Sequence, residues 1–319
     1  MANRLKTAMM ASILILRAKT LMFSFSPGIP TPQSRQAFGW LAVFGSAFCF
    51  YLATAFIRWA DGVVEIETPY FVFARFLLGF IVVCLTMLAR GHRLKPKNYH
   101  YLIGRTVSNT VAVFCFYKAV EVGSLAEANI LNMTYPLFVA LFSWFMLKEQ
   151  RDSFALVIVA VAFCGVWLIL SPGDMSVRLD SLWGLCSGFC AAWAMIYLNL
   201  SRKYHDSQTI LFFLFGLGAL SIFFFFKEAI FWPDKQEFYY LFWCSAAGVL
   251  GQYLLTYGFL FVTAVEGSII SSTRILLAAV LGPYLVGDPA LMLSGWVGAL
   301  LIFGADAMLA LRKAENSRH

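Results

Sequence analysis

Apolar residues along the chain gather into ten long runs that are separated by short polar breaks. A membrane-spanning helix needs about 20 mostly apolar residues, because each residue adds only about 1.5 Å along the helix axis. Ten segments meet this requirement, with residue ranges 38–57, 68–89, 99–120, 125–147, 153–171, 181–201, 207–227, 237–261, 266–286 and 290–311. The pattern predicts an all-α membrane protein with ten transmembrane helices.

Lys and Arg residues are distributed unevenly between the two sets of breaks. Sixteen lie on the side that holds the N-terminus, and five lie on the other side. Short loops rich in Lys and Arg stay in the cytoplasm. The bias therefore predicts a multi-pass protein of the bacterial inner membrane with both termini in the cytoplasm. An even number of helices, such as ten, satisfies this orientation.

The composition agrees with a lipid environment. Hydrophobic residues make up 61% of the chain and charged residues 13%, whereas soluble domains have roughly 45–50% and about 25%. A net charge of +7 would suggest nucleic-acid binding in a soluble protein. Here the basic residues sit between apolar runs, so they anchor and orient helices in the bilayer, and we expect no nucleic-acid partner.

The two ends of the chain are expected to be cytoplasmic tails, residues 1–36 and 313–319. The apolar patch Ile13–Leu16 is too short for a span or a signal sequence. Pro27, Pro30 and Pro32 then oppose a helix. The first tail is basic and is predicted to be loosely ordered. Met22 is an equally sensible first residue, which leaves the start of translation open.

The two halves of the chain resemble each other. Arg58-Trp59-Ala60-Asp61 corresponds to Lys203-Tyr204-His205-Asp206, and Gly165 corresponds to Gly304. The residue numbers differ by 145 at the first helix of each half and by 139 later. We therefore expect two repeats, residues 37–172 and 173–312. Each has five helices, an odd number, so the second repeat is inverted, which is typical of alternating-access carriers.

One stretch also resembles a known family. Ala126-Glu127-Ala128-Asn129, then Tyr135-Pro136-Leu137-Phe138 and then Leu147-Lys148-Glu149 are similar to the repeat of EamA-type transporters in the drug/metabolite transporter superfamily. The resemblance covers about residues 38–311. The second half departs from it, because Ile275 stands where the family often has Pro and Arg274 stands where a small or polar residue is usual.

This resemblance implies a secondary transporter that moves a small organic metabolite. The first half is somewhat more similar to S-adenosylmethionine carriers than to drug exporters. An amino acid or an S-adenosylmethionine-like solute with a carboxylate is therefore expected, with proton or solute counter-transport as an option. Export of drugs or other metabolites is the alternative, and a membrane-embedded lipid enzyme is an alternative of another class. The direction of transport, the coupling ion and the oligomeric state stay open.

Arg274 is the first candidate for solute binding. It lies about eight residues into its predicted helix, and a charged group at that depth costs roughly 2.5–3.5 kcal/mol unless it faces protein or water. A guanidinium binds a carboxylate or phosphate with two hydrogen bonds. The competing interpretation is a structural ion pair with Asp306.

The family resemblance implies a structural or gating role for Arg75. Glu121 or Glu127 is its expected partner. Polar residues at mid-depth on helices that would surround a cavity are further candidates, although each is also suited to joining neighbouring helices. These candidates are Asn109, Tyr117, Asn129, Asn132, Tyr135, Gln252, Tyr253, Tyr257 and Ser271.

No enzyme or cofactor signature is found. The sequence has no Ser-His-Asp arrangement, no phosphate-binding loop and no metal-ligand spacing. Seven Cys lie in apolar runs, and Cys186 and Cys190 are one helical turn apart. They form either a redox or metal pair or, more simply, small packing residues. No catalytic residue, metal or cofactor is predicted.

Overall fold

The computed structural model describes residues 32–91, 93–146, 153–170, 179–262 and 264–316. In these ranges the chain forms helices and no strand. The chain divides into two compact units after Phe38. Residues 32–38 form the start of a helix, and all contacts given below belong to the unit that begins at Gly39. Most of the predicted N-terminal tail, Glu149 and the last three residues lie outside the described ranges.

The helices follow the ten predicted segments. The first half contains α2 (Pro32–Ala60), α3 (Thr68–Arg90), α4 (Tyr99–Val122), α5 (Leu125–Asn132), α6 (Tyr135–Met146) and α7 (Ser153–Leu170). The second half contains α8 (Leu182–Ser201), α9 (Ser207–Phe226), α10 (Lys235–Gly258), α11 (Ala264–Leu285) and α12 (Leu293–Asn316). The segment predicted at 125–147 holds both α5 and α6. The predicted all-α membrane fold with two inverted five-helix repeats is confirmed.

The first helix begins earlier than predicted. α2 starts at Pro32, inside the segment that was expected to be a loose tail. The prediction treated Pro32 as a helix breaker, but proline is favoured in the first turn of a helix, where its missing N–H needs no partner. The segment 32–36 is therefore helical.

Six helical segments of the described chain are long and apolar enough to cross a membrane, and parts of α7 and α11 form shorter apolar helices. α4 and α10 are not among them. The reason is visible in their residues, because α4 carries Arg105 and Asn109 and α10 carries Gln252. All three side chains line the central cavity. The polar residues that lower the mean hydropathy of these two helices therefore face the interior of the protein.

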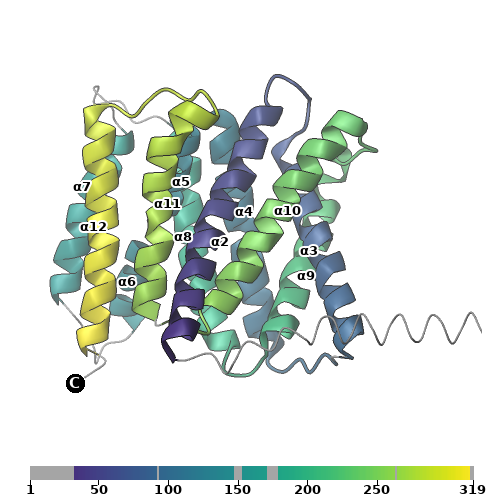
Figure 1. The fold of residues 1–319 in the computed structure, drawn as a ribbon, viewed down its shortest axis with the longest axis horizontal. Coiled ribbons are helices and arrows are strands. Elements are labelled where there is room, and N and C mark those ends of the chain that lie inside the picture. The colour runs from purple at the N-terminus through teal and green to yellow at the C-terminus, as the bar shows by residue number, and fades with distance from the viewer. Residues whose placement is uncertain (1–31, 92, 147–152, 171–178, 263, 317–319) are drawn as a thin grey trace, which may run out of the picture. The chain divides into compact units, whose positions relative to one another are not determined.

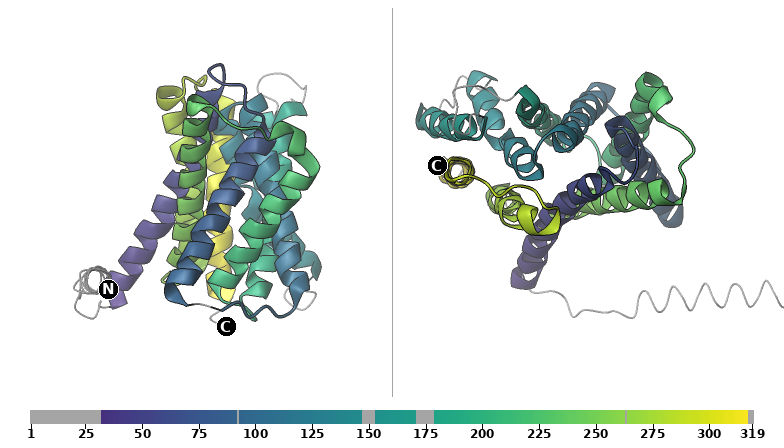
Figure 2. Two further views of the ribbon diagram at one scale, coloured as in Figure 1. Left: turned by 90° about the vertical axis from the view of Figure 1, so that its right-hand side faces the viewer. Right: turned by 90° about the horizontal axis from the view of Figure 1, so that it is seen from above.

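Contacts between the halves repeat in pairs. α3 packs on α9, α5 on α11 and α7 on α12, so each of these helices meets its own counterpart. α3 also packs on α10, and the mirrored pair α4 and α9 is in contact too. α12, α11, α2 and α10 stand side by side in Figure 1, and Figure 2 shows the same row along the helix axes. These contacts are those of two similar repeats related by an approximate two-fold axis.

One pair of contacts shows the symmetry at the level of side chains. A Cβ at Gly79 would lie 2.5 Å from the Phe215 ring, and a Cβ at Gly218 would lie 3.2 Å from the Phe76 ring. Both Gly79 and Gly218, and Phe76 and Phe215, differ by 139 in residue number. Each half therefore packs one phenyl ring against a glycine of the other half.

The two ends of the bundle differ in charge, and hydrogen bonds join the two halves at both ends. We call the end with residues 93–98 and 202–206 the basic face, and the end with residues 61–67 and 286–292 the opposite face. At the opposite face, Asp288 accepts hydrogen bonds from Arg58 Nε (3.1 Å) and from the Leu125 N–H (2.6 Å). Tyr51, Ala55, Leu125 and Ala278 form a buried cluster that continues from this contact into the bundle.

Candidate functional site

A cavity of about 110 Å³ lies inside the helix bundle. It is too small for a drug-sized ligand, which needs roughly 300–1,000 Å³. Its described lining comes from both halves of the chain. The lining residues are Phe50, Arg75, Arg105, Asn109, Ala112, Val113, Phe116, Asn132, Met133, Tyr135, Ala191, Ala194, Met195, Gln252, Leu255, Ser271 and Arg274.

Many lining residues are counterparts in the two repeats. Tyr135 and Arg274 differ by 139 in residue number, and so do Asn132 and Ser271. The same spacing separates Val113 from Gln252 and Phe116 from Leu255. Phe50 and Met195 lie in the first helix of each half and differ by 145, the spacing found for those helices. The cavity therefore lies where the two inverted repeats meet, which is the position of the solute site in carriers of this architecture.

Arg274 reaches the cavity from α11 and is buried. Its Nη2 donates a hydrogen bond to Asn132 Oδ1, while its Nε has no acceptor. Its Cζ lies 5.1 Å from the centroid of the Phe116 ring and 5.8 Å from that of Phe50. A guanidinium over an aromatic face gains about 0.5–2 kcal/mol, so the charge is held in place without a carboxylate.

Arg75 enters from α3 and is held in the same way. Its Nη1 donates to the Tyr117 hydroxyl at 3.1 Å, and its Cζ lies 5.3 Å from the centroid of the Phe50 ring. A Cβ at Gly248 would lie 2.9 Å from Arg75 Nε, so the glycine leaves room for this side chain. The Phe50 ring thus contacts both Arg75 and Arg274, which places two guanidiniums beside one aromatic side chain.

Arg105 of α4 is a third buried arginine in the lining, and the sequence interpretation missed it. Its Nε has no acceptor, and no hydrogen bond or ion pair joins it to any other described residue. The signal was present in the charge count. Of 24 Lys and Arg, 21 lie in tails, loops or helix ends, and Arg75, Arg105 and Arg274 are the remaining three.

The cavity carries excess positive charge. No Asp or Glu is found among its described lining residues, whereas three guanidiniums are. A buried charge without a counter-ion costs several kcal/mol even after the protein relaxes. The arrangement is suited to a ligand that brings negative charge and hydrogen-bond acceptors, because each guanidinium has five N–H donors.

The helix that faces this cavity is interrupted beside it. α5 ends at Asn132, and α6 begins at Tyr135 after a turn in which the Thr134 hydroxyl donates to the Leu131 carbonyl at 2.6 Å. Gly188 of α8 allows close approach here, because a Cβ at Gly188 would lie 2.5 Å from Thr134 Oγ1. The sequence predicted one continuous helix over 125–147, so the interruption is a finding of the structure.

The structure brings together most, but not all, of the predicted solute-binding residues. Arg274, Asn109, Asn132, Tyr135, Gln252 and Ser271 line the cavity. Four others lie outside its lining. Tyr117 bonds to Arg75, Asn129 Nδ2 bonds to Thr54 and the Leu125 carbonyl, Tyr257 accepts from Gln208, and Tyr253 stacks on Tyr257.

The expected ion pairs of the buried arginines do not form. Arg274 and Asp306 are both described, and Asp306 accepts from Ser272 at 3.0 Å instead of pairing with Arg274. Arg75 does not meet Glu121, which pairs with Lys118 at 2.5 Å, or Glu127, which accepts from Ser181. The sequence placed these residues at similar depths, but depth does not fix the direction in which a helix turns them.

The cysteines bring no metal site into the described part of the chain, where no group of three His, Cys, Asp or Glu residues could hold an ion. Cys186 is exposed, and its Sγ lies 3.7 Å from the Sγ of buried Cys115. The described cysteines are free thiols.

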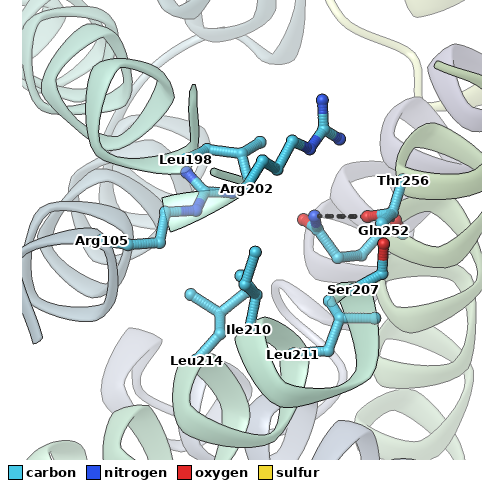
Figure 3. Close-up of a pocket in the computed structure, with 9 residues that line it drawn as sticks. All are labelled: Arg105, Leu198, Arg202, Ser207, Ile210, Leu211, Leu214, Gln252 and Thr256. Atoms are coloured by element: carbon cyan, nitrogen blue, oxygen red, sulfur yellow. Dashed lines mark hydrogen bonds between the residues drawn. The ribbon is translucent and has the colours of Figure 1, made fainter. Parts of the chain in front are cut away.

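A second, much smaller pocket of about 10 Å³ adjoins the cavity on the side of the basic face. Figure 3 shows its lining, in which Arg105 and Gln252 are shared with the cavity. Ile210, Leu211 and Leu214 of α9 provide its apolar part. Arg202, just after α8, completes it, and burial lowers the pKa of its guanidinium.

Comparisons with known proteins agree with this architecture. The family model described as "EamA-like transporter family" matches twice, at residues 37–171 and 179–311. A solved crystal structure aligns with a TM-score of 0.56 over 87% of this chain and 98% of that chain, at 20% identity, and shows the same fold.

Curated relatives are named as transporters. An "Uncharacterized transporter" of Helicobacter pylori (strain J99) is 30% identical over 286 residues, covering 86% of this chain and 95% of that protein. The "Pseudopaline exporter CntI" of Pseudomonas aeruginosa is 27% identical, covering 69% and 77%. Human "Solute carrier family 35 member G1" is 29% identical, covering 46% and 41%.

The fold, the central cavity between the halves and the repeated contacts together define a multi-pass membrane transporter made of inverted repeats. The chain belongs to the EamA-like transporter family.

Proposed function

We propose that the protein is a secondary transporter that carries a small organic anion by alternating access. The observation that supports this best is the group of buried arginines, Arg75, Arg105 and Arg274, around a cavity with no described acidic residue in its lining. A carboxylate or phosphate supplies the missing negative charge and accepts the unused N–H donors.

The charge of the cavity bears on the choice of solute. A carboxylate-bearing amino acid and an S-adenosylmethionine-like solute both fit the sequence. S-adenosylmethionine carries a sulfonium and an ammonium besides its carboxylate, and three guanidiniums repel those groups. A metabolite with net negative charge, such as a dicarboxylic or phosphorylated compound, therefore fits the cavity best. The relative named as a pseudopaline exporter supports transport of a small metabolite by this type of chain.

The closed opposite face fits one state of an alternating-access cycle. Asp288 ties Arg58 at the end of α2 to the start of α5, and the buried cluster around Tyr51 lies below this contact. Opening toward that face requires these contacts to separate. We place the basic face in the cytoplasm of a bacterial cell, because Lys and Arg are concentrated there.

The test is transport into proteoliposomes that contain the purified protein. Radiolabelled dicarboxylates, sugar phosphates, neutral amino acids and S-adenosylmethionine are offered to the wild type and to Arg274→Gln. We expect uptake of at least one net-anionic solute, and a loss of about 10- to 100-fold in the variant, because a hydrogen bond to a charged group is worth about 1.5–3 kcal/mol.

Arg90→Gln is the matched control, because it removes the same charge at a residue that is exposed at the end of α3. Its transport should equal that of the wild type. Transport of S-adenosylmethionine alone, unchanged in Arg274→Gln, would contradict the proposal. Orientation is tested in whole cells with Lys203→Cys in a variant whose native cysteines are replaced by serine, because Cys164 and Cys186 are exposed. A cysteine-reactive, membrane-impermeant reagent should leave this variant unlabelled until the cells are permeabilised.

A further inference from the structure

Arg105 is the described residue whose charge the proposed solute site explains least. Arg75 is bonded to Tyr117, and Arg274 is bonded to Asn132. Arg105 has neither an ion pair nor a hydrogen bond with another described residue, although it is buried to 4% exposure. Its position in the middle of the second turn of α4 excludes neutralisation of a helix C-terminus as its purpose.

The position of Arg105 between two spaces suggests what it does. It lines the central cavity, and it lines the smaller pocket on the side of the basic face, together with Gln252. Figure 3 shows the Arg105 side chain above Ile210 and Leu214, with Gln252 across the pocket. The Gln252 amide donates to Thr256 Oγ1 at 3.5 Å, so these two polar groups lie on the same side.

Arg202 provides a second guanidinium farther toward the basic face. It is half-buried, and its positive charge acts on Arg105. Arg202 is in a good position for the dipole of α8, which explains Arg202 alone. It does not explain why a second arginine, Arg105, is buried nearby among apolar residues, where its charge and that of Arg202 repel each other.

We propose that Arg105 and Arg202 form a second oxyanion site, which receives the carboxylate or phosphate of the solute between the central cavity and the basic face. The solute class rests on the proposed function, whereas the anion site rests on the two arginines themselves. Arg105 contacts the anion in both positions because it lines both spaces. The pocket of about 10 Å³ is the closed form of this passage, and it must widen when the solute moves through.

The experiment measures thermal unfolding of the full chain in nanodiscs made of zwitterionic phosphatidylcholine, titrated with inorganic phosphate. A ligand that binds the folded protein raises its melting temperature. Arg274→Gln weakens the central site and should keep part of the phosphate response. Adding Arg202→Gln to it should lower the remaining apparent affinity for phosphate by about tenfold or more, because one charge-assisted bond is lost.

Lys203→Gln is the matched control, because Lys203 is the exposed neighbour of Arg202. In the Arg274→Gln background it should leave the phosphate response unchanged. Arg202 is half-buried, so its variant is expected to fold, and the melting temperature without phosphate reports any general loss of stability. An unchanged phosphate affinity in Arg274→Gln/Arg202→Gln would overturn the second site.

The same design separates the two proposals. If Arg274→Gln responds to phosphate like the wild type while Arg202→Gln alone does not, the second site stands and the central site fails. If Arg274→Gln abolishes the response and Arg202→Gln does not change it, the second site fails and the central site stands.

A lipid headgroup has the same oxyanion chemistry as a solute. Nanodiscs with phosphatidylglycerol form the comparison arm. Stabilisation by this lipid through Arg202, with no response to phosphate in phosphatidylcholine, would assign the arginines to the membrane and overturn a site for the solute. A response to phosphate in phosphatidylcholine, lost with Arg202→Gln, supports it.

Discussion

The two repeats agree in how they pack and disagree in what they bring to the cavity. Phe76 and Phe215 exchange equivalent positions against Gly218 and Gly79, and lining residues occur in counterpart pairs. The charges do not follow this rule. Arg75 and Arg105 belong to the first repeat, and Arg274 belongs to the second.

The counterparts of the three arginines are uncharged. At the spacing of 139, Arg75 corresponds to Leu214, Arg105 to Cys244 and Arg274 to Tyr135. In carriers with inverted repeats the two halves exchange arrangements during alternating access, which favours similar packing in both repeats. A single solute is not symmetric, so its binding groups need not be. The shared packing of the two repeats therefore reflects the proposed movement of the halves. The charges that have no counterpart reflect the proposed solute.

Exchanging a symmetric pair of lining residues tests this comparison with the largest expected effect. Arg274→Tyr should lower transport of the anionic solute by about 10- to 100-fold, since a charge-assisted bond is lost. The double variant Tyr135→Arg/Arg274→Tyr returns the guanidinium to the cavity from α6. We expect it to recover transport to within about tenfold of the wild type in proteoliposomes. A double variant no better than Arg274→Tyr would show that the two positions are not equivalent.

Asp288 joins the second repeat to the first at the opposite face. Asp288→Asn should destabilise the protein by about 1.5–3 kcal/mol, because this buried carboxylate accepts from Arg58, Ser124 and the Leu125 N–H. Asp61→Asn is the control. Asp61 also pairs with Arg58, at 3.3 Å, but its side chain is 64% exposed, and exposed pairs contribute at most about 1 kcal/mol. Thermal unfolding in detergent compares the two, and equal losses would contradict the closure described for this face.

The glycine pair sharpens the comparison of the packing. A methyl group at Gly79 would lie 2.5 Å from the Phe215 ring, whereas at Gly218 the nearest Phe76 atoms are 3.2 Å away. Gly79→Ala should therefore cost about 1–3 kcal/mol through overpacking. Gly218→Ala should cost less, because its neighbours need to move only a few tenths of an ångström. Thermal unfolding tests this, and Gly79→Ala should have the lower melting temperature of the two variants. The reverse order would show that the repeats do not pack as described.

The smallest effect is expected at Tyr253, whose counterpart at the spacing of 139 is Phe114. Neither residue lines the cavity, and Tyr253 stacks on Tyr257 at a centroid distance of 6.2 Å. Tyr253→Phe keeps the ring and removes the hydroxyl. We expect transport within about twofold of the wild type, because the hydroxyl that is removed is buried without a hydrogen-bond partner among the described residues and lies outside the cavity lining. A loss as large as that of Arg274→Tyr would return Tyr253 to the solute site.

Hydropathy predicted the fold well because the bilayer imposes one strong rule on sequence: backbone polar groups must be satisfied inside each spanning segment. The helices, the inverted repeats and the family follow from that rule and from the matched residues. It also predicted the burial of Arg274 and Arg75, since intramembrane charge requires an interior position. Partners could not be predicted in this way, and Asp306 and Glu127 both bond elsewhere.

The site was predicted only in part for a related reason. Asn129 and Asn132 share one face of a short helix, but only Asn132 reaches the cavity. Asn129 bonds instead to Thr54 of α2. Which of two such neighbours meets a solute depends on helix rotation and on the adjacent helix, neither of which is encoded in a hydropathy pattern. Arg105 was overlooked because it lies near the start of α4, where an arginine resembles an anchor.

The turn between α5 and α6 is a point at which the proposed solute would stiffen a helix. Asn132 ends one piece and Tyr135 begins the other, and both face the cavity. Local bonds already cross the turn, among them the bond from the Thr134 hydroxyl to the Leu131 carbonyl. The proposed solute, bonded to both side chains, would add a further bridge. Occupancy of the proposed site would then appear as lost conformational freedom in this helix.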